Sequence, residues 1–73
     1  MKNFHDYYFG MPVKARDDYV ARVGTTISYA ERLAGGFRLP SLGMAKRLID
    51  ASNGEISFHS IIATWEAKNG PLA

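Results

Sequence analysis

The N-terminal segment has the clearest helical spacing of apolar residues in the chain. Phe4, Tyr7 and Tyr8 follow one another at i, i+3 and i+4, which places them on one helical face. Asn3 is a suitable N-terminal cap, and Gly10 is a stop signal. A short helix is therefore predicted between these two residues.

Two further helices are expected at about residues 12–23 and 26–33. Pro12 suits the first position of the earlier helix because its missing N–H costs nothing there, and Gly24 is the turn between the two. The Gly35–Gly36 pair can supply the positive φ that a helix C-terminus often needs. The side chains predicted to face inward are Val13, Ala15, the stem of Arg16, Tyr19, Val20, Val23, Ala30 and Leu33.

Two more helices are predicted in the C-terminal half. Ser41 caps the first, which ends at residues 53–54. Ser57 caps the second, which ends at about Lys68, before the stop signal of residues 69–71. Their apolar stripes are Leu42, Ala45, Leu48 and Ile49 in the first, and Phe58, Ile61, Ile62 and Trp65 in the second. Because no stretch alternates with a period of two, the chain is predicted to be all-α, a compact bundle of four or five short helices.

Length and composition narrow the classes of function. The 73 residues make a single domain, 1–73, whose expected stability is a few kcal/mol. The chain has no Cys, which suits a reducing cytoplasm. No apolar run approaches the roughly 20 residues of a membrane span, and the N-terminus lacks the features of a signal peptide, so no membrane partner is expected. The net charge is +2 with basic and acidic residues interleaved, which leaves nucleic-acid and protein partners both open.

Catalysis and cofactor binding are not expected. Asp17 and Asp18 are adjacent and point to different helical faces, so they do not form a paired acid and base. His5 and His59 have no second ligand at metal spacing, and Ser60 beside His59 is a weak sign of a nucleophile. The chain is therefore predicted not to be an enzyme and to have no catalytic residues, no metal site and no cofactor.

The middle of the chain combines a Gly turn, a short helix and a Pro-Ser helix start at fairly specific spacing. The residues that carry the pattern are Gly24-Thr25-Thr26, Ala30, Leu33, Gly36, Pro40-Ser41-Leu42 and Asn53-Gly54. This pattern resembles the helix-turn-helix domain of Cro and phage repressors, over roughly Val13 to Gly54. The resemblance implies that residues 26–33 are a recognition helix.

The two ends of the chain carry a second resemblance. The opening Met-Lys-Asn-Phe-His-Asp-Tyr-Tyr-Phe and the closing Asn-Gly-Pro-Leu-Ala, together with the length, are similar to small transcription regulators of Xanthomonas lytic phages. This resemblance implies host RNA polymerase as partner, through its core subunits in the host cytoplasm. It also implies inhibition of promoter-dependent initiation by interference with σ-factor engagement, with antitermination as a further role.

The helix-turn-helix resemblance assigns a set of DNA-binding positions. Carried over from the family, they are Thr26, Ile27, Ser28, Glu31 and Arg32, with Arg38 in a phosphate-binding role. Arg or Lys reads guanine best and Asn or Gln reads adenine best, yet this helix offers one Arg and none of the other three. Glu31 would repel phosphate unless it met a cytosine amino group. The alternative is an ordinary solvated face on a scaffold helix.

The loop after this helix departs from the family pattern. The family usually places Lys or Arg against phosphates here, whereas this chain has Phe37 and Leu39 around Arg38. One of the two apolar residues can tuck under the fourth helix. If both are exposed together with Ile27, the DNA face is partly apolar, which suits a protein partner better.

The N-terminus is the candidate surface for contact with polymerase. Aromatic residues are common anchors at protein interfaces, and basic residues near them can meet acidic groups. The candidate residues are Lys2, Phe4, His5, Asp6, Tyr7, Tyr8, Phe9, Lys14 and Arg16. For the aromatic face of Phe4, Tyr7 and Tyr8, the alternative is packing in the core.

Two functions remain open. The first is a phage transcription regulator that binds RNA polymerase on a helix-turn-helix scaffold. The second is a sequence-specific DNA-binding repressor of the Cro type, which usually dimerises to span two half-sites. No feature of the sequence argues clearly for a dimer, so a monomer is expected.

Overall fold

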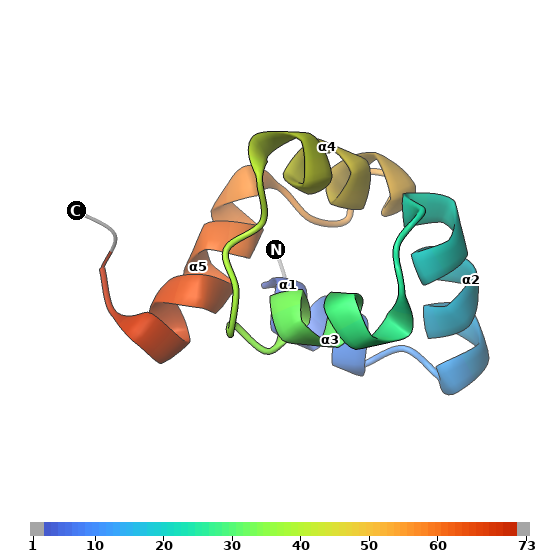
Figure 1. Cartoon of the computed structure of the whole chain (residues 1–73), viewed down its shortest axis with the longest axis horizontal. Helices are drawn as coiled ribbons and strands as arrows, with labels where there is room; N and C mark the ends of the chain where they lie inside the picture. The colour runs from blue at the N-terminus through green and yellow to red at the C-terminus, as the bar shows by residue number, and fades with distance from the viewer. Residues whose placement is uncertain (1–2, 72–73) are drawn as a thin grey trace.

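The computed structural model describes residues 3–71, and these residues form five helices and no strand (Figure 1). The helices are α1 (Phe4–Phe9), α2 (Val13–Val23), α3 (Ile27–Ala34), α4 (Leu42–Ala51) and α5 (Phe58–Asn69). The Cα radius of gyration is 11.0 Å, close to the roughly 11 Å expected of a compact chain of this length. The prediction of a compact all-α bundle is confirmed.

Polar caps set the start of four helices where the sequence predicted them. The side chains of Asn3, Thr26, Ser41 and Ser57 each accept a hydrogen bond from a backbone N–H in the first turn of the helix that follows. At α5 the cap is reciprocal, because the Ser60 hydroxyl also accepts from the Ser57 N–H, at 3.1 Å. Local chemistry therefore accounts for these helix starts.

The end of α3 depends on one glycine rather than two. Gly36 has the left-handed φ of 79°, whereas Gly35 has an ordinary helical φ of −78°. The N–H of Phe37 donates to the Arg32 carbonyl at 3.0 Å and the N–H of Gly36 donates to the Leu33 carbonyl at 3.2 Å, which is a Schellman motif. A Cβ on Gly36 would also lie 2.9 Å from the Thr64 carbonyl oxygen, so this position needs glycine for space as well as for φ.

The five helices enclose one core. In Figure 1, α3 lies in front of α1, α2 and α5 flank them on opposite sides, and α4 closes the arrangement at the top. Contacts join α1 to α3 and α5, and join α4 to α2 and α5. The buried apolar side chains are Phe4, Tyr8, Tyr19, Val20, Val23, Ala30, Leu33, Ala34, Ala45, Leu48, Ile56 and Ile61. Every helix contributes to this core, so none is an independent unit.

Side-chain donors tie α2 to α4 at both of their C-terminal ends. Arg47 of α4 donates from Nε to the Val23 carbonyl at 2.9 Å, and Arg22 of α2 donates to the Ala51 carbonyl at 3.1 Å. The Tyr19 hydroxyl donates to the Leu48 carbonyl at 2.6 Å in the buried space between them. Each helix thus satisfies carbonyl groups that the last turn of the other leaves without a helical partner.

Three apolar side chains predicted to face the core are exposed, and the prediction was wrong for each. Val13 is 65% exposed, Leu42 is 76% exposed and Phe58 is 45% exposed. On α5 the inner face is turned toward Ser60 and Thr64, which are buried instead of Phe58. Burial of these two hydroxyls is tolerated because both are hydrogen-bonded, and it leaves Phe58 on the surface.

Candidate functional site

The N-terminal candidate residues are divided between the core and the surface. Phe4 and Tyr8 are fully buried, and the ring of Tyr8 lies 6.5 Å from the ring of Tyr19, centroid to centroid. Both belong to the face of α1 that packs on α3 and α5, because they stand four residues apart. The prediction that Phe4 and Tyr8 contact a partner is therefore wrong, and packing in the core is confirmed for them.

His5, Phe9 and Arg16 form a small cluster at the surface. The ring centroids of His5 and Phe9 are 4.9 Å apart, and the Arg16 guanidinium carbon lies 5.8 Å from the Phe9 centroid. Arg16 is held in place by a hydrogen bond from its Nε to the Met11 carbonyl, at 3.0 Å. The structure thus brings together three of the predicted contact residues.

The other N-terminal candidates lie around this cluster or outside the described residues. Tyr7 is half-buried and meets Tyr19 edge-on, with ring centroids 5.4 Å apart. Lys14 is exposed at the start of α2. Lys2 lies outside the described residues.

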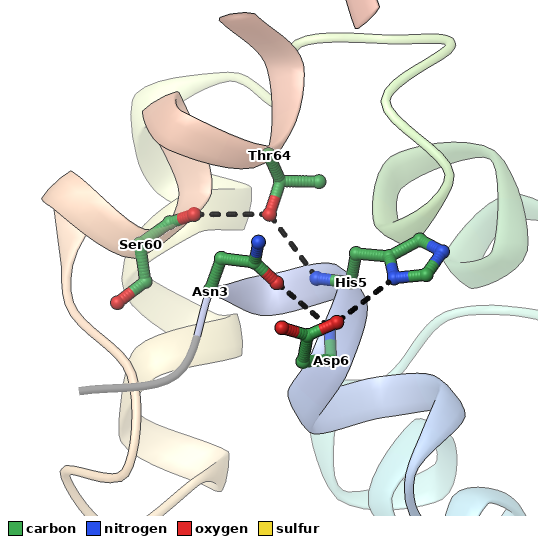
Figure 2. Close-up of polar contacts among 5 residues, drawn as sticks. All are labelled: Asn3, His5, Asp6, Ser60 and Thr64. Carbon is green, nitrogen blue, oxygen red and sulfur yellow. Dashed lines mark hydrogen bonds and ion pairs between the residues drawn. The ribbon is translucent and has the colours of Figure 1, made fainter. Parts of the chain in front are cut away.

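A chain of hydrogen bonds fixes the start of α1 against α5 (Figure 2). The backbone N–H of His5 donates to Thr64 Oγ1 at 3.1 Å, and that hydroxyl donates to the Ser60 carbonyl at 3.0 Å. On the same turn, the N–H of Asp6 donates to Asn3 Oδ1 at 2.8 Å, and Asp6 Oδ1 lies 3.3 Å from His5 Nδ1. The His5 imidazole points away from Thr64 and stays on the surface, as Figure 2 shows.

This network forms one wall of a surface hollow of about 390 Å³ between α1 and α5. Its lining includes Asn3 and His5 at the start of α1, and Thr64 and Lys68 on α5. The Lys68 ammonium also lies 4.1 Å from the ring centroid of Phe37. The hollow is therefore lined by polar and basic residues, and the Lys68 ammonium lies beside an exposed aromatic ring, which suits polar contacts with a protein surface.

Thr64 and Lys68 were missed by reasoning from the sequence. The contact between His5 and Thr64 spans 59 residues, and no local pattern reports it. The only hint in the sequence is the i, i+4 spacing of Ser60 and Thr64, which puts two hydroxyls on one side of α5.

The predicted reading positions of α3 all face outward. Thr26, Ile27, Ser28, Glu31 and Arg32 are exposed, as the helical pattern required. The hydroxyl of Thr26 is already used as the helix cap, since it accepts from the Tyr29 N–H at 3.1 Å. Ile27 is 42% exposed, so an apolar side chain stands at the start of this face.

The loop between α3 and α4 extends this apolar character. Phe37 is 67% exposed and Leu39 is 38% exposed, with Arg38 exposed between them. Phe37 therefore does not tuck under α4, whereas Leu39 is mostly covered and lies beside Leu42 and Ala45 of α4. Ile27 is also exposed. The face that would contact DNA is therefore partly apolar, as expected from the sequence if all three residues were exposed.

The electrostatics of the tyrosines show no sign of a reactive group. Burial raises the pKa of Tyr19 well above its ordinary value of 10.0, with a smaller contribution from the neighbouring Tyr7. Burial is also the main cause that raises the pKa of Tyr7 and Tyr8. Among the buried side-chain polar atoms of residues 3–71, the Tyr8 hydroxyl is the one without a hydrogen-bond partner. These groups remain neutral at physiological pH.

Two properties of the described residues bear on the classes of function. Within residues 3–71, no helix is long and apolar enough to span a bilayer. In the same range, no three His, Cys, Asp or Glu side chains gather as metal ligands would.

Comparisons with known proteins found nothing similar to this chain. No protein-family model matches it, no curated protein matches it, and no solved structure matches it.

Proposed function

We propose that this chain is a phage transcription regulator that binds host bacterial RNA polymerase in the host cytoplasm, on a helix-turn-helix scaffold. The observation that carries the proposal is the joint exposure of Ile27, Phe37 and Leu39 along α3 and the loop after it. Exposed apolar residues next to polar and charged ones are typical of a surface that binds protein. A face that reads DNA would instead concentrate Lys, Arg, Asn and Gln.

The α1 side of the molecule supports the same proposal. The cluster of His5, Phe9 and Arg16 and the hollow beside Lys68 offer aromatic, cationic and hydrogen-bonding groups. Aromatic and Arg side chains are the residues most enriched at interface hot spots. We take core subunits of the polymerase as the partner, because the two ends and the length of the chain resemble small transcription regulators of Xanthomonas lytic phages.

The expected consequence is inhibition of promoter-dependent initiation. A small domain bound to core enzyme can interfere with σ-factor engagement by occupying part of the surface on which the σ-factor docks. Antitermination is a further role that the same contact with polymerase would permit.

The direct test is co-elution of the purified chain with core RNA polymerase in the absence of DNA. We expect a stable complex, and at least tenfold weaker binding for Phe37→Asp. Val13→Asp is the matched control, because Val13 is another exposed apolar residue but belongs to α2 and not to the α3–α4 loop. If the chain does not co-elute with core enzyme, the proposal fails.

A repressor of the Cro type is the second candidate, favoured by the outward orientation of all five reading positions on α3. On this view Arg32→Ala and Arg38→Ala abolish function, and affinity for duplex DNA falls steeply with salt. If the chain binds core polymerase and neither substitution weakens that binding, the DNA-reading face is not needed for it. The repressor function would then not explain the binding to polymerase.

A further inference from the structure

An apolar groove runs along α4 and the N-terminal end of α5, and the surfaces above do not include it apart from Leu39 at its edge. Two adjoining hollows, of about 540 Å³ and about 190 Å³, share Leu42 and Phe58 as walls. Ile49 lines the larger hollow, and Leu39 and Ile62 line the smaller. These five residues define the α4–α5 groove.

We propose that the α4–α5 groove docks a single amphipathic helix of host RNA polymerase. The inference deepens the proposed function and rests on it. Leu42 and Phe58 are the starting point, because both stand at positions where the helical pattern predicts burial and both are exposed on the same hollow. Two apolar residues left in water side by side are covered at a gain in free energy when a partner docks.

The chemistry of the groove selects a helix over an extended segment. The polar side chains among the residues that line the two hollows are Lys46 and Asp50, both on the outer edge of α4. An extended peptide would bury backbone N–H and C=O groups against apolar walls without partners for them. A helix satisfies its own backbone groups and presents an apolar face, which is the helix-in-groove mode of recognition.

Gly43 is consistent with close approach of a second helix. It lies in the first turn of α4, and a Cβ added there would meet nothing within 4 Å. Glycine destabilises a helix relative to alanine, so this position carries a cost that no contact among residues 3–71 explains. The missing side chain leaves the backbone of α4 open to a partner at the edge of the groove.

The charged edge of the groove indicates what flanks the apolar face of the partner. Lys46 Nζ and Asp50 Oδ2 are 3.1 Å apart and both are well exposed. Because the two side chains form an ion pair with each other, a partner helix that carries polar residues beside its apolar face can meet this edge without leaving either charge unpaired.

The area of the groove argues against a second copy of this chain. A standard interface buries about 800 Å² on each partner, which is about a fifth of the 4462 Å² surface of the described chain. From their exposed fractions, Leu39, Leu42 and Phe58 supply roughly 300 Å² of apolar surface. That area fits one face of a short helix, whereas a stable homodimer would need an interface that extends well beyond these three side chains.

The test measures binding of the full chain to purified core polymerase without DNA. We expect Leu42→Glu and Phe58→Glu to weaken binding at least tenfold and Val13→Glu to leave it unchanged. Because all three side chains are exposed, thermal melts should show that every variant is folded. A photoreactive p-benzoylphenylalanine in place of Leu42 should crosslink to a helical segment of the polymerase.

Each other result has a distinct meaning. If the parent chain binds and the Leu42 and Phe58 variants bind equally well, the groove proposal is overturned while the proposed function stands. A crosslink to a strand or a loop also overturns it. If sedimentation shows that the free chain self-associates and that Leu42→Glu abolishes this, the occupant is a second copy and the proposal is wrong. If the parent chain does not bind core polymerase at all, the proposed function fails and this inference fails with it.

Discussion

Helix α4 contacts α2 and α5 through different kinds of interaction. Toward α2, the helix is joined by the buried Tyr19 hydroxyl and by the reciprocal pair of Arg22 and Arg47. Toward the N-terminal end of α5, it leaves Leu42 and Phe58 in water around an open groove. One helix thus has a side whose contacts stabilise the fold and a side with exposed apolar residues, so substitutions on the two sides should have different effects on stability.

The largest expected effect separates the buried and exposed leucines of α4. Leu48→Ala should cost about 3 kcal/mol of unfolding free energy, because it removes a fully buried side chain and leaves a cavity. That loss corresponds to a drop of roughly 10–20 °C in the thermal midpoint. Leu42→Ala is the control and should shift stability by about 0.5 kcal/mol or less. Equal effects in thermal melts would show that the two sides of α4 are not different.

Tyr19→Phe tests the polar part of the α2–α4 contact. It keeps the ring and removes the hydrogen bond to the Leu48 carbonyl, which is then buried without that donor. The expected cost is about 2 kcal/mol by chemical denaturation. Tyr29→Phe is a suitable comparison, because Tyr29 is only partly buried. A cost below about 0.5 kcal/mol would mean that the buried hydroxyl contributes little.

Gly43→Ala tests the side of α4 that faces the groove. Because a Cβ meets nothing there, the substitution should stabilise the chain by about 0.5–1 kcal/mol through helix propensity. Gly36→Ala is the opposite case and should destabilise, since Gly36 has a left-handed φ and lies close to the Thr64 carbonyl. A loss of stability in urea melts of the Gly43 variant would show a contact at this position.

The buried tyrosines make the stability of the fold depend on pH in alkali. The pKa values of Tyr7, Tyr8 and Tyr19 lie above the ordinary 10.0 in the folded chain, mainly because of burial. The folded state therefore holds these protons more tightly than the unfolded state does. Stability is fully present below about pH 10 and falls as the pH rises further. Absorbance titration of tyrosinate, with and without denaturant, measures the difference, and identical titration curves would contradict it.

Helix starts and stops could be predicted because they depend on neighbours in sequence. Asn3 and Ser57 each cap the helix that directly follows, and Gly36 supplies the one backbone conformation that ends α3. These interactions span a few residues, so the sequence alone contains the information that determines them.

The faces of the helices were harder to assign. In α4 and α5 the apolar stripe is wider than the surface that packs against the core. Periodicity alone does not predict which edge of the stripe stays exposed to solvent. Leu42 and Phe58 are at that edge, whereas the buried Ser60 and Thr64 owe their places to hydrogen bonds. The bond between His5 and Thr64 depends on the complete fold, so the hollow beside Lys68 could not be foreseen.

The bond between His5 and Thr64 has a consequence for how the protein is made. It joins the first helix to the last of the five, and α1, with six residues, is too short to persist alone in water. During translation, α3 and Tyr19 of α2 are made before α5, but the α5 side of the α1 environment cannot form until Thr64 has been synthesised. A chain that stalls before Thr64 therefore lacks part of the cover over Phe4 and Tyr8, and exposed aromatic residues are targets of chaperones and proteases.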